Sequence, residues 1–137
     1  MIIKTAIPVL FICSIGIAVF SCNKDKAPVP VTPDVCTSLP ATVSFKHDLI
    51  PLFKSQCSIA GCHSGGSPGG HLNLDSLVAY SQLMQAGKGY VDTVNIDASV
   101  LYAFMISSSQ IMPPSGKLDN CSIQLVYKWI QQKAKNN

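Results

Sequence analysis

The stretch Cys57-Ser-Ile-Ala-Gly-Cys62-His63 decides how this chain folds and what it binds. Two thiols and an imidazole lie within seven residues, and the histidine directly follows the second cysteine. In this order each thiol can form a thioether with a vinyl group of haem, and the imidazole can bind the iron. The usual attachment signature is C-x-x-C-H, and here two further residues separate the cysteines. The stretch therefore predicts a chain folded around one covalently bound haem c.

Residues 1–21 predict an export signal of the lipoprotein type. Lys4 precedes an apolar run from Ala6 to Phe20, and a charged start followed by about 15 apolar residues is typical of a secretory signal. The run ends Val-Phe-Ser-Cys22, which is similar to a bacterial lipobox. We expect Cys22 to carry a lipid that anchors the exported domain to a bacterial membrane, in the periplasm or at the cell surface. An ordinary signal peptide or an uncleaved anchor is the alternative.

The cysteines of the expected domain that do not bind haem could form a disulfide. An exported protein meets an oxidising compartment, which favours disulfide formation. If haem takes Cys57 and Cys62, then Cys36 and Cys121 remain to pair with each other. Such a bridge closes a loop of about 85 residues and would stabilise the fold by about 4 kcal/mol in the chain-entropy description. The alternatives are that both thiols are free, or that all four cysteines form two disulfides.

The chain divides into a tether and a domain. In residues 22–35, Pro28, Pro30 and Pro33 alternate with Val and Thr, which predicts an extended Pro-rich tether. The domain is then residues 36–137, in which apolar residues recur at helical spacing and no useful strand-like alternation is found. We therefore predict an all-α fold of about four helices. The first helix is expected to start at Asp48. The other three are expected to span Asp75–Ala86, Asp97–Ser107 and Asn120–Lys135.

The start of the first helix is placed by a proline. The Asp48 carboxylate can cap a free backbone N–H, and Pro51 then falls in the first turn, where its missing N–H breaks no helical bond. A start at Ser44 would instead put Pro51 inside the helix, which is costly. The helix leads into Cys57, where a haem-attaching helix should end.

Apolar stripes predict the buried faces of the helices. In the second helix Leu77, Tyr80 and Met84 share one stripe. In the last helix Leu125 and Trp129 form a second stripe beside the main one, so this helix is expected to contact two partners. The main stripe consists of Ile123, Val126, Tyr127, Ile130 and Ala134.

A haem that carries electrons usually has a sixth ligand as well, and methionine is the usual partner of histidine in c-type sites. Met112 is the best candidate, because Pro113 and Pro114 follow it and restrict the backbone of its loop. Met105, like Met84, lies on an apolar helix face and is expected in the core. His71, just after the glycine-rich residues 64–70, is the alternative sixth ligand.

The order of these segments resembles a known family. It is similar to the small monohaem class I cytochrome c domains, and especially to the planctomycete-type cytochrome c family of bacterial lipoproteins. The resemblance covers residues 45–135, nearly the whole expected domain. It implies Cys57 and Cys62 as thioether sites, His63 as the proximal and Met112 as the distal iron ligand, and a first and a last helix that cross. The segments that carry it are Asp48-Leu-Ile-Pro-Leu-Phe53, Cys57 to His63, Ile111-Met-Pro-Pro114 and Lys128-Trp-Ile130.

These observations predict an electron carrier rather than an enzyme, a monomer that exchanges electrons with redox proteins. Two functions without haem stay open: a zinc-binding module that uses Cys57, Cys62 and His63, with or without His71, and a disulfide-stapled binding domain with a Cys57–Cys62 bridge. With haem, peroxidase-like chemistry or a role in a larger redox complex is the alternative. All ten basic residues are lysines and all seven acidic ones aspartates. We find no basic stripe with interleaved aromatic residues, so nucleic acid is not an expected partner. The absence of arginine also argues against bidentate phosphate or carboxylate recognition.

Overall fold

The computed structural model describes Cys36 and residues 38–137. The expected signal in residues 1–21, the tether of residues 22–35 and the lipid site at Cys22 lie outside the described residues. Within the described part, the chain is helical and has no strand, which agrees with the expected all-α class. No helix of that part is long and apolar enough to cross a membrane.

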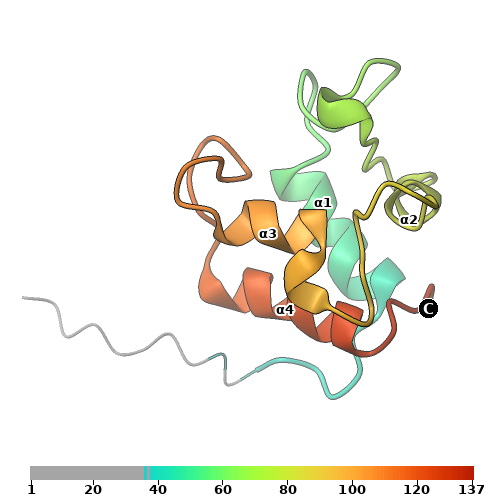
Figure 1. Cartoon of the computed structure of the whole chain (residues 1–137), viewed down its shortest axis with the longest axis vertical. Coiled ribbons are helices and arrows are strands. Elements are labelled where there is room, and N and C mark those ends of the chain that lie inside the picture. The colour runs from blue at the N-terminus through green and yellow to red at the C-terminus, as the bar shows by residue number, and fades with distance from the viewer. Residues whose placement is uncertain (1–35, 37) are drawn as a thin grey trace, which may run out of the picture. The chain divides into compact units, whose positions relative to one another are not determined.

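Four α-helices and three shorter helical turns follow one another along the described chain, and Figure 1 shows their arrangement. Helix α4 packs against η1, η3 and α3. The bounds are η1 Phe45–Leu49, α1 Ile50–Gln56, η2 Gly69–His71, α2 Ala79–Leu83, η3 Ile96–Ala98, α3 Val100–Ile106 and α4 Asn120–Gln131.

The prediction that the first helix starts at Asp48 was wrong: η1 begins at Phe45 and its N-cap is Ser44, four residues earlier. The Ser44 hydroxyl accepts the His47 N–H, and the Asp48 carboxylate accepts the Ser44 N–H at 2.7 Å, a reciprocal cap of the first turn. Asp48 therefore caps the first turn from within the helix, and not as the residue that precedes it. The predicted conflict with Pro51 is avoided because η1 is a wide π-turn, which ends before Pro51 enters the first turn of α1.

Asn137 supports this same turn from the other end of the domain. Its backbone oxygen accepts the Lys46 N–H at 2.9 Å, and its side-chain oxygen accepts the Phe45 N–H at 3.0 Å. First-turn N–H groups have no partner inside their own helix, so these bonds satisfy donors that would otherwise need water. The two ends of the domain are thereby joined.

The second predicted helix is shorter than expected and buries a different face. A turn precedes α2, in which the Asp75 carbonyl accepts the N–H groups of Val78 and Ala79. Leu77 lies in that turn and is 98 % exposed, and Met84 at the other end is also exposed. The prediction that Met84 is core was therefore wrong: the buried residues of α2 are Ala79 and Leu83.

The third predicted helix is divided at Ser99, whose backbone is extended between η3 and α3. Its hydroxyl, fully buried, accepts the Asp92 N–H at 2.8 Å, which fixes the preceding loop instead of continuing the helix. Serine competes for backbone groups in this way and favours helix ends. Asp97 lies inside η3 and makes no cap there.

The core centres on Trp129 of α4, which is fully buried. Its ring lies 5.2 Å from that of Phe45 in η1, and its Nε1–H donates to the Lys135 carbonyl at 2.9 Å. Phe45 in turn packs edge-on against Phe53 of α1 and Tyr80 of α2. The predicted main stripe of α4 is largely correct, because Ile123, Val126, Ile130 and Ala134 are all buried.

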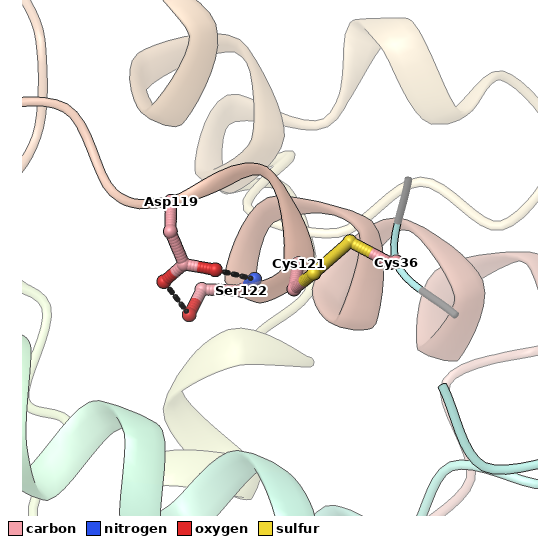
Figure 2. The surroundings of a disulfide bond; sticks show 4 residues. All are labelled: Cys36, Asp119, Cys121 and Ser122. Carbon is pink, nitrogen blue, oxygen red and sulfur yellow. Dashed lines mark hydrogen bonds between the residues drawn. A yellow bond between two sulfur atoms is a disulfide. The ribbon is translucent and has the colours of Figure 1, made fainter. Parts of the chain in front are cut away.

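A disulfide joins Cys36 to Cys121 in the first turn of α4 (Figure 2). Beside it, the Asp119 carboxylate accepts both the N–H and the hydroxyl of Ser122 (Figure 2). Asp119 is thus the N-cap of α4, and these two bonds hold the pKa of its carboxyl below the usual range. The bridge and the cap fix the same helix end.

Two long loops leave the helices. Residues 57–78 follow α1 and form the green segment that extends above the helices in Figure 1. Residues 107–119 join α3 to α4 as the orange loop in the same view. Helices α3 and α4 lie side by side. The chemically interesting residues of the sequence are therefore carried by loops on a helical frame.

Replacing Trp129 with alanine should lower the free energy of unfolding by about 3–5 kcal/mol, because a large buried ring is lost and the Lys135 carbonyl loses its donor. Urea unfolding followed by circular dichroism measures this, since the variant has no tryptophan left for fluorescence. Gln131→Ala, an exposed change on the same helix, should stay within about 0.5 kcal/mol. Equal losses in the two variants would contradict the assignment of Trp129 as the core.

Candidate functional site

A cavity of about 330 Å³ lies between α1, α3 and the two long loops. Its size falls in the range of roughly 300–1,000 Å³ that is usual for small-molecule and cofactor sites. It collects all four residues that the sequence predicted to hold haem: Cys57, Cys62, His63 and Met112. The helices contribute Leu52 and Phe53 from α1, with Val100, Leu101, Phe104 and Met105 from α3.

The lining of this cavity is apolar and uncharged. Among the described residues no lysine and no aspartate lines it, and its polar side chains are Gln56, His63 and Tyr90, besides the cysteines. The Tyr90 hydroxyl is itself occupied, because it donates to the Gly70 carbonyl at 3.2 Å. Such a lining excludes water and favours a flat apolar molecule with few polar groups.

The segment from Cys57 to His63 is a closed loop. Cys57 ends helix α1, and the His63 N–H donates back to the Cys57 carbonyl at 3.1 Å. Inside the loop the Cys62 N–H donates to the Ile59 carbonyl at 2.8 Å, and Gly61 adopts φ +81°, which glycine tolerates best. The four intervening residues are thus absorbed in a turn that leaves Cys57, Cys62 and His63 along one cavity.

The imidazole of His63 is oriented by a hydrogen bond. Its Nδ1 lies 3.0 Å from the Leu72 carbonyl oxygen. Since a carbonyl can only accept, Nδ1 carries the proton and Nε2 keeps its lone pair. The His63 carbonyl also accepts the Leu74 N–H at 2.7 Å. A metal-binding histidine normally has its second nitrogen held in this manner, so His63 is prepared to donate Nε2 to a metal.

Both thiols are partly buried and are not joined to each other. Burial, with the neighbouring Cys62 sulfur as a second cause, raises the pKa of Cys57 to about 11. At neutral pH Cys57 is therefore a thiol rather than a thiolate. The structure does not show the Cys57–Cys62 bridge that the disulfide-stapled alternative requires.

Met112 reaches the cavity from the loop of residues 107–119. Its N–H donates to the Phe104 carbonyl at 3.0 Å, which ties this part of the loop to α3. The side chain is 36 % exposed, so it closes the cavity at its edge.

Met105 is a second methionine in the same cavity, and its side chain is only 5 % exposed. The sequence assigned it to the core and not to the site. That core prediction is confirmed, and no sequence pattern indicated that Met105 also lines the cavity.

His71 is exposed and does not line the cavity, although Gly69, Gly70 and Leu72 do. Gly70 and His71 both have left-handed backbones, with φ +59° and +58°. Within the described residues, no group of three or more His, Cys, Asp or Glu side chains could hold a metal ion. The cavity thus does not bring His71 together with Cys57, Cys62 and His63, so a zinc site there would lack His71 as a fourth ligand.

Asp75 holds the loop on both sides of His63. One carboxylate oxygen accepts the Ser58 hydroxyl at 2.5 Å, and the other accepts the Gly65 N–H at 3.0 Å. Asn73 completes the network, because its amide donates to the Gly65 carbonyl and its oxygen accepts the Asp75 N–H. The Gly65 N–H and the Ser58 hydroxyl hold the pKa of the Asp75 carboxyl below its ordinary value. No sequence motif pointed to Asp75 as part of the site.

Asp75→Asn should make the unfolding free energy less sensitive to acid. A carboxyl whose pKa is lowered by folding stabilises the fold fully above its ordinary value, near 3.8, and loses that stabilisation as the pH falls through the folded value. The variant should therefore flatten the decline below pH ~4 and be less stable than wild type at neutral pH. Urea unfolding across this pH range measures it. Asp97→Asn, an exposed aspartate of η3, is the matched control, and an identical profile for both variants would contradict the role of Asp75.

No family model, curated protein or solved structure matches this chain. The function must therefore be argued from the cavity itself and from the residues that line it.

Proposed function

We propose that this chain is a c-type cytochrome: an exported, membrane-anchored electron carrier with a cytochrome c-like fold and one covalently held haem. The single observation that carries the proposal is the convergence of Cys57, Cys62, His63 and Met112 on one apolar cavity. These four residues are 55 positions apart at most along the chain, between Cys57 and Met112, and lie on two different loops. Neither zinc binding nor a small disulfide accounts for the methionine or the apolar lining.

The residues fit a haem by the chemistry of their donors. Cys57 and Cys62 would hold it through thioethers, His63 would bind iron through Nε2, and Met112 would offer its thioether sulfur as a second iron ligand. The protonation of Cys57 suits the attachment, because a thiol S–H adds across a vinyl double bond without loss of atoms. The haem, when bound, supplies a one-electron ferrous–ferric couple.

The remaining residues control the environment of that couple. The apolar helix residues that line the cavity exclude water, and a methionine ligand in a low-dielectric site favours the ferrous state. Met112 lies at the cavity edge and is partly exposed, so a redox protein could approach the cofactor there. His63 and Met112 would each offer the iron a ligand, which suits electron transfer without substrate chemistry. Two further parts of the proposal come from the sequence: a lipid on Cys22 that anchors the domain, and redox proteins as its partners.

The full chain, made in a host that matures c-type haem, should show an intense Soret band and the mass of one attached haem. The reduced and oxidised spectra of the purified protein test this. The double variant Cys57→Ala, Cys62→Ala should lose the attached mass, whereas Cys36→Ala, Cys121→Ala should keep it. A colourless wild-type protein that holds equimolar zinc would support the zinc-binding module instead of the cytochrome. A protein with neither haem nor zinc would favour the disulfide-stapled domain.

Met112→Ala should keep the attached haem but lose the weak absorption band at the red end of the visible spectrum that reports methionine ligation. The reduction potential should fall, because axial ligands set haem potentials over a range of roughly 0.8 V. Potentiometric titration and absorption spectra measure both. Met105→Leu is the matched control, with a buried thioether replaced by an isosteric side chain, and should retain the band. Loss of the band in Met105→Leu alone would assign the distal ligand to Met105 instead.

A further inference from the structure

We propose that Asp75 is a positioning residue, which sets the orientation of His63 by bracing the Cys57–His63 loop and thereby lowers the reduction potential of the haem. This inference rests on the proposed function and names a control element within it. The brace is defined as residues 72–75 with the bonds that they make to the loop. It is separate from the four residues that would touch the haem.

The Asp75 carboxylate spans the histidine. Ser58 lies directly after Cys57, and Gly65 lies two residues after His63. One oxygen of Asp75 holds the first and the other oxygen holds the second. Because the two contacts flank His63 in the chain, they limit how far the loop can open around it. A neutral amide can accept from only one of these two donors, because its NH₂ group accepts no hydrogen bond.

The rest of the brace acts directly on His63. The Leu72 carbonyl accepts its Nδ1–H at 3.0 Å, and the Leu74 N–H donates to its carbonyl at 2.7 Å. Asn73 lies between them and holds the Gly65 carbonyl at 3.0 Å. Consecutive residues 72–75 therefore alternate between contacts to His63 and contacts to its flanks. A displacement of Asp75 would move the Leu72 carbonyl as well.

The brace is itself fixed to the helical frame. The Asp75 carbonyl accepts the N–H groups of Val78 and Ala79 at 2.9 and 2.8 Å, and Ala79 is fully buried in α2. Leu72 and Leu74 are also buried and line the cavity. The loop that carries the thioether cysteines is thus held against the core by residues 72–75, and Asp75 contributes the two contacts that flank His63.

This arrangement has an electronic consequence. A hydrogen bond from the second nitrogen of a ligating histidine raises the basicity of the ligand, which stabilises the ferric state and lowers the potential. If the brace loosens, the Nδ1–H bond to Leu72 weakens, and the ferrous state becomes more stable relative to the ferric state. A residue that only stabilised the fold would change the unfolding free energy and leave the potential where it was.

Asp75→Asn, made in the haem-loaded full chain, should raise the ferrous-to-ferric ratio at a fixed electrode potential about tenfold, which for a one-electron couple is about 59 mV. Ser58→Ala removes one arm without changing the charge and should raise the ratio several-fold, whereas Ser58→Thr, which keeps the hydroxyl, should match wild type. Asp97→Asn changes the same charge outside the brace and should also match wild type.

Amide hydrogen exchange of Gly65 gives a readout that does not depend on haem. In the full chain as isolated, Asp75→Asn should speed this exchange at least tenfold, and Asp97→Asn should not. A wild-type chain that carries no haem overturns the proposed function and the tuning with it. A haem-loaded wild type whose Asp75→Asn variant keeps both the potential and the Gly65 exchange overturns the brace alone. A shift in Asp75→Asn without one in Ser58→Ala would attribute the potential to charge and overturn the positioning role.

Discussion

The hydrogen bond between His63 Nδ1 and the Leu72 carbonyl is the interaction on which the rest of the site depends. It decides which ring nitrogen keeps its lone pair, and it fixes the plane of the imidazole. It also joins two segments that the glycine-rich residues 64–70 would otherwise leave free to separate. The neighbouring bonds of residues 73–75 repeat this connection on both sides of His63. The loop after α1 is therefore ordered by its bonds to residues 72–75 rather than by a helix of its own.

Much of the fold could be predicted because it depends on apolar periodicity and on a few strong local signals. The last helix was predicted correctly at its start, since its stripe of buried residues at helical spacing is long, but it ends at Gln131 rather than at the predicted Lys135. Short helices were predicted poorly. The stripe through Leu77 and Met84 had the correct period, but the buried face is set by what packs on Ala79 and Leu83, and a sequence does not show this.

The candidate site could likewise be predicted only in part. Cys57, Cys62, His63 and Met112 could be found from the sequence because their chemistry is unusual and their spacing informative. Their meeting in one cavity depends on tertiary packing, and so does the presence of Met105 there. Asp75 could not be found, since an aspartate before a helix normally indicates a cap, and only the folded loop brings Ser58 and Gly65 to its carboxylate. The π-turn that accommodates Pro51 could not be predicted, because no residue pattern indicates such a turn.

The disulfide at the start of α4 has a mechanical meaning. A pull on the chain before Cys36 reaches Cys121 through the covalent bridge, in the first turn of the helix that packs on η1, η3 and α3. Part of the load is then carried by the core around Trp129. The loop of residues 107–119 ends at this helix start, so the bridge and the Asp119 cap also fix the end of the segment that carries Met112.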